Sequence, residues 1–400
     1  MDSKKIRVGV IFDATIDLGG GFQHQLSSII ELNNSKKFEL IFLVLDKKNK
    51  EYLKKSYNIE ANFVKFNIFD YLFMLLSLQK WFWMLVIMIF KIRSHFEKKL
   101  EKYDLDILYF LRPSGVLFNI TSHNFILNVF DLAHRDFPEF PEVNFYKEFE
   151  KRELFYETIL KKAVAIITDS EDGKVNIVKR YNIEPSRIYV VSYKPSYAIT
   201  LKKKECNVFE KYNIPGDYIF YPAQFWAHKN HVYITEALAI LKQMGIEIFA
   251  VFSGSDKGNL KHVLEFAKVI GVQDFVKYIG FAPEEDMFSL YKNAFALVMP
   301  SYFGPTNIPP LEAFAVGIPV IYSDLPSFRE QVKDAALFCD LKDPMSLVNH
   351  LINLKQNKEL RNILIENGKK RLEELTEVKV SKLLEEILNE YFIKLKCWKV

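Results

Sequence analysis

Cysteine is scarce in this chain. Its 400 residues include only Cys206, Cys339 and Cys397, which lie far apart and have no metal-ligand spacing. Disulfide-rich secreted domains and zinc-binding domains need several cysteines at short spacings. We therefore expect reduced thiols and a cytoplasmic protein.

An excess of one charge is also missing. The sequence has 54 Lys and Arg against 50 Asp and Glu, a formal net charge of +4. Because nucleic-acid-binding proteins usually concentrate positive charge, this balance does not indicate such a partner. A hydrophobic content of 49% with 26% charged residues is that of a globular protein and excludes a disordered chain.

No secretory signal is evident at the N-terminus. The first apolar run ends at Phe12, is short and lacks a small-residue cleavage site. It is better interpreted as a first buried strand.

One longer apolar segment, Leu72–Phe90, approaches the length of a membrane span. Gln79 and Lys80 lie at its middle, where a charge in hydrocarbon is costly. The sequence favours a buried helix pair. An interfacial face that docks on the inner membrane leaflet, with basic residues towards anionic lipid, and a spanning helix stay open as alternatives. The basic residues that follow are Lys91, Arg93, Lys98 and Lys99.

Short apolar runs alternate with helical patterns along most of the chain. Such continuous apolar strands between helices indicate parallel sheets covered on both faces, the doubly wound α/β class, here twice. The expected strands are Arg7–Asp13, Phe38–Leu45, Ile107–Leu111, Ile126–Phe130, Ala165–Asp169 and Ile188–Val191, then Tyr218–Pro222, Ile248–Ser253, Val276–Ile279, Ala296–Met299, Pro319–Ser323 and Ala335–Phe338.

The pattern is interrupted at Lys194–Glu210, which contains Pro195 and few apolar residues. We expect Rossmann-like domains at 1–200 and 201–377, and a helical segment at 378–400 that packs back towards the first domain. Ligands of such folds bind at the carboxyl ends of the strands, so a cleft between two facing domains is the expected site.

Three strand-to-helix loops carry the candidate chemistry. The first contains Gly20 and Gly21 before a helix, where backbone N–H groups approach an anion; it lacks the G-x-G-x-x-G fingerprint of a nicotinamide cofactor. The second places Lys229 near the start of a helix, as a point charge for phosphates.

The third loop, Pro300–Val320, is the most informative. We expect a helix to begin near Pro310, with the amides of Thr306 and Asn307 around a diphosphate at its positive end. Glu312 is expected in the first turn, where its carboxylate accepts hydrogen bonds from ribose hydroxyls.

At this point the sequence resembles the retaining glycosyltransferases of family 4, which have the GT-B fold. Phe303-Gly-Pro-Thr-Asn-Ile-Pro-Pro-Leu-Glu is similar to the loop of bacterial surface-polysaccharide members, with Gly304 where the usual first glutamate stands. Lys229 matches the family's diphosphate-binding lysine, and Gln224 replaces its arginine. The resemblance implies further donor contacts from Gly254, Phe281 and Ile308.

In the first domain, Asn128-Val-Phe-Asp-Leu-Ala-His resembles the family's His-Asp loop near the transferred sugar. Phe130 stands where histidine is common, Asp131 matches, and His134 follows. The resemblance implies that Asp131 and His134 orient acceptor or sugar, while Lys229 and Glu312 complete the catalytic set.

The resemblance implies a retaining, metal-independent transfer of a hexose from a GDP- or UDP-sugar to a glycan or lipid-linked acceptor in surface-polysaccharide synthesis. No cofactor is expected. Asp104-Leu-Asp106 has the form of a metal motif from another glycosyltransferase fold, but its place before a strand favours a turn. A nucleotide-sugar epimerase of the same fold and a non-catalytic scaffold subunit stay open as alternatives.

Overall fold

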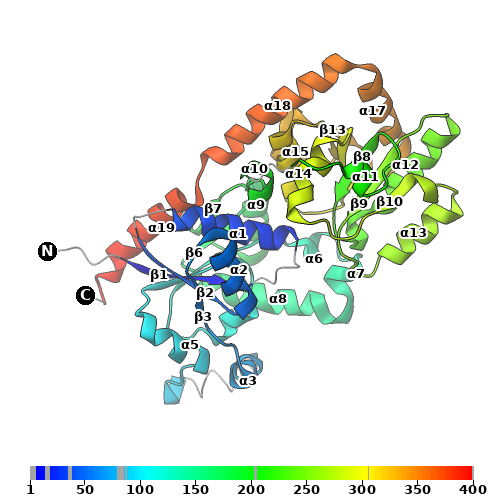
Figure 1. Cartoon of the computed structure of the whole chain (residues 1–400). Coiled ribbons are helices and arrows are strands. Elements are labelled where there is room, and N and C mark those ends of the chain that lie inside the picture. The colour runs from blue at the N-terminus through cyan, green and yellow to red at the C-terminus, as the bar shows by residue number, and fades with distance from the viewer. Residues whose placement is uncertain are drawn as a thin grey trace. The chain divides into compact units, whose positions relative to one another are not determined.

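The computed structural model describes residues 6–13, 19–34, 38–78, 85, 88–201, 205–304 and 306–398 (Figure 1). The chain forms two compact units. Unit 1 comprises residues 1–132, 150–191 and 378–400, and unit 2 comprises 133–149 and 192–377. These limits differ from the expected domain limits mainly in one segment, because residues 133–149 group with unit 2.

Unit 1 is built on a seven-stranded parallel sheet of order β3-β2-β1-β4-β5-β6-β7. Its strands are β1 (Arg7–Phe12), β2 (Glu39–Val44), β3 (Asn62–Phe63), β4 (Ile107–Phe110), β5 (Phe125–Asn128), β6 (Ala165–Thr168) and β7 (Ile188–Val190). The six expected strands are present with ends shifted by one or two residues. The sequence missed β3, because two residues are too few for a periodic pattern.

The helices of unit 1 connect these strands in a doubly wound arrangement. They are α1 (Gly20–Asn33), α2 (Lys47–Tyr57), α3 (Ile68–Ser77), α5 (His95–Leu100), α9 (Glu171–Tyr181), α19 (Val380–Leu395) and most of α8 (Glu148–Ile159). The α9 helix is capped at its start, where the Ser170 hydroxyl accepts a hydrogen bond from the Gly173 N–H at 3.0 Å.

The last helix, α19, packs within unit 1. The Glu31 carboxylate of α1 accepts a hydrogen bond from the Ser381 N–H at 2.9 Å. The Tyr391 hydroxyl donates to the Asp106 carbonyl and accepts from the Asn124 amide, both at 3.0 Å. The α19 helix is thereby tied to the residues directly before β4 and β5.

Unit 2 contains a six-stranded parallel sheet of order β10-β9-β8-β11-β12-β13. Its strands are β8 (Tyr218–Pro222), β9 (Phe249–Ser253), β10 (Val276–Tyr278), β11 (Ala296–Met299), β12 (Val320–Ser323) and β13 (Leu337–Cys339). Its principal helices are α12 (His231–Gln243), α13 (Leu260–Val269), α14 (Glu284–Lys292), α15 (Ile308–Val316), α16 (Pro326–Val332), α17 (Pro344–Gln356) and α18 (Lys358–Glu377).

Both sheets confirm the doubly wound α/β prediction. The central strands β1, β4, β8, β9, β11 and β12 are almost entirely buried, as in parallel sheets covered by helices on both faces. In each sheet the strand order reverses beside the first strand, between β1 and β4 and between β8 and β11. Ligands of open α/β sheets bind at such reversal points.

The expected buried helix pair at Leu72–Phe90 is wrong for the part that the structure describes. Leu72, Leu75 and Leu76 of α3 are exposed, and only one side of the helix packs inward. Residues 79–84 and 86–87 of this segment lie outside the described residues. Within the described part of the chain, no helix combines the length and apolar character needed to cross a bilayer.

The Asp104-Leu-Asp106 sequence forms the expected turn before β4. Asp104 adopts a left-handed conformation, with φ of 48°. The Asp106 carboxylate accepts a hydrogen bond from the Arg7 N–H at 2.9 Å. Both acids therefore shape the sheet edge.

Candidate functional site

The loops that follow β8 and β11 leave the same edge of the unit 2 sheet. These strands are neighbours and run parallel, so their carboxyl ends lie side by side. The loop after β8 carries Lys229 at the end of a short 3-10 helix, Ala227–Lys229, directly before α12. The loop after β11 leads to Asn307, the residue before α15.

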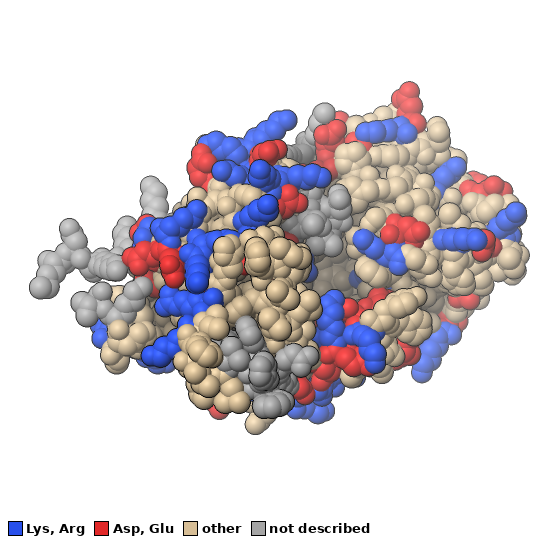
Figure 2. Space-filling model, turned by 90° about the horizontal axis from the view of Figure 1, so that it is seen from below, with Lys and Arg blue, Asp and Glu red and all other residues tan. Residues whose placement is uncertain are grey.

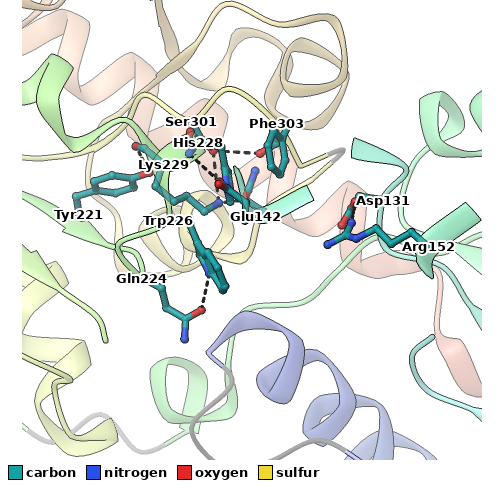
Figure 3. Close-up of polar contacts among 11 residues, drawn as sticks. Asp131, Glu142, Arg152, Tyr221, Gln224, Trp226, His228, Lys229, Ser301 and Phe303 are labelled. Carbon is teal, nitrogen blue, oxygen red and sulfur yellow. Dashed lines mark hydrogen bonds and ion pairs between the residues drawn. The ribbon is translucent and has the colours of Figure 1, made fainter. Parts of the chain in front are cut away.

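The structure brings Lys229 and Asn307 together. The Lys229 ammonium donates hydrogen bonds to the Asn307 side-chain oxygen at 3.3 Å and to the Ser301 hydroxyl at 3.4 Å. The Lys229 carbonyl accepts a hydrogen bond from the Tyr221 hydroxyl at 2.9 Å (Figure 3). The expected lysine is therefore held at the reversal point of the sheet.

Asn307 is itself fixed by two residues that the sequence did not single out. Its N–H donates to the Gln331 side-chain oxygen at 3.1 Å, and its carbonyl accepts from the Gln331 amide at 2.7 Å. Its side-chain amide donates to the Tyr322 hydroxyl at 2.6 Å. The Asn307 N–H that we expected to face a diphosphate is thus engaged within the protein, and its side-chain oxygen accepts a hydrogen bond from Lys229.

The expected position of Glu312 in its helix needs correction. The α15 helix begins at Ile308, two residues before the expected start near Pro310, so Glu312 lies in the second turn. Glu312 is buried there. Its carboxylate accepts hydrogen bonds from the Tyr291 hydroxyl at 2.6 Å and from the Ser196 N–H at 3.3 Å. Burial raises the pKa of the Glu312 carboxyl, against these hydrogen bonds, which lower it. Its contact with ribose stays a prediction.

Gly304 occupies a conformation that explains the absence of a glutamate. Its φ of 116° lies in the region that residues with a side chain rarely adopt. A Cβ atom at this position would stand 3.4 Å from the side-chain amide of Asn307. Ile308 and Thr306, the other predicted donor contacts of this loop, are buried beside it.

Gln224, which replaces the family's arginine, is engaged at both ends of its amide. Its oxygen accepts from the Trp226 indole at 3.1 Å (Figure 3). Its nitrogen donates to the Ser255 hydroxyl, also at 3.1 Å. Gln224 therefore links the loops that follow β8 and β9. This neutral link stands where the family's arginine would supply a cationic contact to the donor.

The predicted contacts Gly254 and Phe281 follow β9 and β10. A Cβ atom on Gly254 would lie 2.3 Å from the Ala223 carbonyl, so the close approach of two loops requires glycine here. The Gly254 N–H donates to the Gly280 carbonyl at 2.9 Å. The Phe281 side chain is 59% exposed and is open to contact a ligand.

An aromatic and acidic cluster beside Lys229 was missed by sequence reasoning. The His228 ring stacks on Phe303 with centroids 3.8 Å apart. The backbone N–H of His228 donates a hydrogen bond to the Glu142 carboxylate, and the ring Nδ1 of His228 also hydrogen-bonds to that carboxylate. Phe140 packs edge-on against Phe303. Burial would raise the pKa of Glu142, but hydrogen bonds from His228 outweigh it and hold that pKa below its ordinary value. No local motif marks Glu142, because its partner lies far along the chain.

The remaining predicted residues occupy separate environments. Gly20 and Gly21 form the first turn of α1, after Gly19 with a φ of 57°. In unit 1, the Asp131 carboxylate pairs with Arg152 at 3.1 Å. His134 belongs to unit 2, where it is buried and lies edge-on to Phe149 at 5.5 Å. Asp131 and His134 therefore belong to different units.

A metal site would need a cluster of ligands. Among the described residues, no group of three or more His, Cys, Asp or Glu side chains is arranged to hold an ion. The groups that the described loops offer for recognising an anion are the Lys229 ammonium and nearby hydrogen-bonding side chains.

Comparison with known sequences identifies relatives of the second half of the chain. Residues 206–371 match the family described as glycosyl transferases group 1. The chain is 27% identical over 213 residues to O-antigen chain mannosyltransferase B of Escherichia coli, covering 52% of this chain and 56% of that protein. It is 26% identical over 220 residues to the O-antigen chain mannosyltransferase RfbU of Salmonella typhimurium, covering 53% and 58%. The matched stretches thus span little more than half the length of these relatives.

Solved structures establish the fold. HepE from Anabaena, in complex with UDP and glucose, superposes with a TM-score of 0.73 at 12% identity, covering 96% of this chain and 100% of that one. Such a low identity is evidence for the fold alone. Residues 206–371 of this chain are thus similar to glycosyl transferases group 1, and its two parallel sheets have the GT-B fold.

Proposed function

We propose that this chain is a glycosyltransferase that moves a hexose from a nucleotide sugar to a glycan or lipid-linked acceptor in bacterial surface-polysaccharide synthesis. The donor is a GDP- or UDP-sugar, and the reaction retains the anomeric configuration, as in glycosyltransferase family 4. The matched relatives are named O-antigen chain mannosyltransferases, which favours mannose as the hexose.

One observation carries this proposal. Lys229 lies at the β8–β11 reversal point with its ammonium on Asn307 and Ser301. A diphosphate would replace these neutral acceptors with charged oxygens, which form hydrogen bonds about twice as strong. In this proposal the Lys229 ammonium binds the diphosphate that leaves when the sugar is transferred.

The proposed reaction follows from where charge develops. As the bond between the sugar and the diphosphate breaks, negative charge grows on the phosphate oxygens, and a fixed ammonium stabilises it. The acceptor hydroxyl attacks the sugar from the same face and gives its proton to the departing phosphate. Asp131 and His134 orient acceptor or sugar, and Glu312 accepts hydrogen bonds from the ribose hydroxyls of the donor. No metal or cofactor takes part in this scheme.

Acceptor-dependent release of nucleoside diphosphate tests the proposal. Purified protein is incubated with GDP- or UDP-hexoses, with and without a lipid-linked acceptor, and free nucleotide and product are measured. Release that requires the acceptor supports glycosyl transfer. An altered sugar nucleotide without acceptor would instead identify an epimerase, and no turnover with any pair would favour a scaffold.

Lys229→Ala is the matched variant for the donor site. Loss of a hydrogen bond to a charged group is expected to weaken donor binding by about 1.5–3 kcal/mol, measured by titration calorimetry. Lys261→Ala, at an exposed position on α13, is the control and should leave donor affinity unchanged. Equal affinities for the Lys229 variant and the wild type would contradict the assigned phosphate site.

A further inference from the structure

The outer side of α3 exposes large apolar side chains. Ile68, Phe69, Leu72 and Leu75 expose 73%, 65%, 54% and 57% of their surface. The side chains of Met88, Ile89 and Phe90, further along the chain, are also exposed. Soluble surfaces rarely expose so many large apolar residues from one short segment, and where they do, the surface usually contacts a partner or a membrane.

The α3 helix is held by capping and packing contacts in spite of this exposure. Asn67 and Asp70 form a reciprocal capping box at its start. The buried Asp70 carboxylate pairs with Lys99 of α5 at 2.6 Å, and Phe73 is buried on the inner side. The exposed apolar side is therefore presented by a helix that is anchored on its opposite side.

Positive charge surrounds this apolar side. The segment from Lys65 to Tyr103 has seven Lys and Arg but only three Asp and Glu, an excess equal to the net charge of the whole chain. Its acids are all engaged: Asp70 with Lys99, Glu97 with His123, and Glu101 with Arg93. Lys65, Lys91, Lys98 and Lys102 are exposed, and none forms an ion pair within the described residues.

Figure 2, which views the molecule from the α3 side of Figure 1, shows an area free of charged side chains among the described residues, with Lys and Arg side chains along part of its border. The exposed residues of α3 are largely apolar. An apolar centre with a basic border matches the chemistry of an anionic membrane surface. Acyl chains accept the apolar side chains while lipid phosphates attract the lysines.

We propose that the outer side of α3 (Ile68, Phe69, Leu72, Leu75 and Leu76) and the exposed lysines around it (Lys65, Lys91 and Lys98) form a docking surface for an anionic lipid bilayer. This α3 surface fits a bilayer better than a second copy of the chain. A symmetric contact between two copies would bring the same lysines against each other, and like charges across an interface are unfavourable.

Vesicle co-sedimentation of the full chain tests this inference. The protein should sediment with vesicles that contain phosphatidylglycerol, sediment weakly with pure phosphatidylcholine, and be released as salt concentration rises. The triple variant Phe69→Ser, Leu72→Ser and Leu75→Ser should lose about tenfold or more in binding for each side chain removed. Its matched control replaces Val175, Val269 and Ile363, exposed apolar residues on other helices, with serine and should bind like wild type.

The charge contribution is tested separately. Lys91→Glu with Lys98→Glu should weaken binding to anionic vesicles by about fivefold or more for each lysine. The control is Lys261→Glu with Lys268→Glu on α13 in unit 2. Lys229→Ala should bind vesicles like wild type, so that failure of the donor site and failure of this surface are distinguishable.

Two results would overturn the α3 surface. One is wild-type protein that stays in the supernatant with every vesicle composition. The other is a triple variant that is folded, as circular dichroism shows, and that binds vesicles as well as its control does. A dimer that the triple variant abolishes, without vesicle binding by either protein, would assign the surface to a second copy instead.

Discussion

Lys229 is held in place by a network that runs from the loop after β11 to strand β12 and helix α16. It contacts Asn307, and Asn307 is held on both backbone groups by Gln331 of α16 and on its side chain by Tyr322 of β12. The Tyr322 hydroxyl also donates to Gln331 at 3.2 Å, which closes the network. Because all these groups are buried, each hydrogen bond restricts where the lysine's partner can lie.

Tyr322→Phe tests this network at a single atom. Loss of the hydroxyl leaves the Asn307 amide without its acceptor and should lower the free energy of unfolding by about 1–3 kcal/mol. It should also weaken donor binding severalfold, since Asn307 would no longer be fixed beside Lys229. Thermal unfolding and titration calorimetry measure the two effects.

Tyr218→Phe is the matched control for that variant. The Tyr218 hydroxyl is also buried and donates to the Leu290 carbonyl at 2.7 Å, away from Asn307. This control should lose stability to a similar degree and keep its donor affinity. Equal donor affinities for both variants would show that the Tyr322 network does not position the site.

Only part of this site could be predicted from the sequence. Lys229 and Asn307 are marked by their places in strand-to-helix loops, which fix their position at the sheet edge. No sequence motif identifies Gln331 or Glu142. Each contacts the site through a residue distant in sequence, Asn307 for Gln331 and His228 for Glu142. Glu312 was placed one turn too early because two prolines obscured the start of α15.

At the scale of elements, α5 is tied to the turn before β5 by one buried carboxylate. Glu97 accepts hydrogen bonds from Thr121, from the N–H of Ser122 at 2.8 Å and from His123 Nδ1 at 2.9 Å. Burial alone would raise the pKa of this carboxyl, but the hydrogen bonds from His123, Thr121 and Ser122 lower it from 4.5 to about 2.

This shift gives Glu97 a pH-dependent contribution to stability. A carboxyl whose pKa is lower in the folded state stabilises that state above its unfolded pKa, and the contribution is lost as pH falls from 4.5 towards 2. Glu97→Gln should therefore lower the free energy of unfolding by up to about 3 kcal/mol near neutral pH. The difference from wild type should shrink as the pH falls through this range.

Urea denaturation at a series of pH values measures that difference. Glu157→Gln, at an exposed position on α8, is the control and should change stability by less than about 0.5 kcal/mol. A wild-type advantage over Glu97→Gln that stays constant down to the acid end would contradict the role assigned to Glu97.

The α19 helix is the element that returns the end of the chain to unit 1. Leu388 is fully buried there, whereas Ile393 in the same helix is 68% exposed. Leu388→Ala should cost about 2–5 kcal/mol of unfolding free energy, because it leaves a cavity in the packing of α19. Ile393→Ala is the matched control, and equal losses in urea denaturation would show that α19 does not pack on unit 1.

Whether a segment forms a helix or a strand was predicted more reliably than whether its side chains are buried or exposed. The apolar runs identified six strands in each half, since buried parallel strands are continuously apolar. The same character misled the interpretation of α3, because an apolar helix that is buried and one that faces a membrane have the same composition. The exposure of Leu72 and Leu75 in the structure shows only that this side of α3 is not buried within the chain.

At the scale of the whole molecule, the two-sheet architecture follows directly from the sequence pattern. The division into units does not, since residues 133–149 lie between two segments of unit 1 in sequence yet group with unit 2. The His228–Glu142 contact accounts for part of this grouping, because it ties this segment to the loop that carries Lys229. A contact between residues 86 positions apart leaves no periodic signal in the sequence.

The central claim is that this chain binds a nucleotide sugar through the β8–β11 edge of unit 2. Its most direct test is thermal unfolding of the purified protein with GDP, UDP, dTDP, ADP and their common sugars, in parallel with Lys229→Ala. A ligand at a hundred times its dissociation constant stabilises the folded state by about 2.7 kcal/mol. We predict a clear rise in melting temperature with one nucleotide and its sugars, reduced in the Lys229 variant. No rise with any of these ligands, or an equal rise in both proteins, would contradict the account.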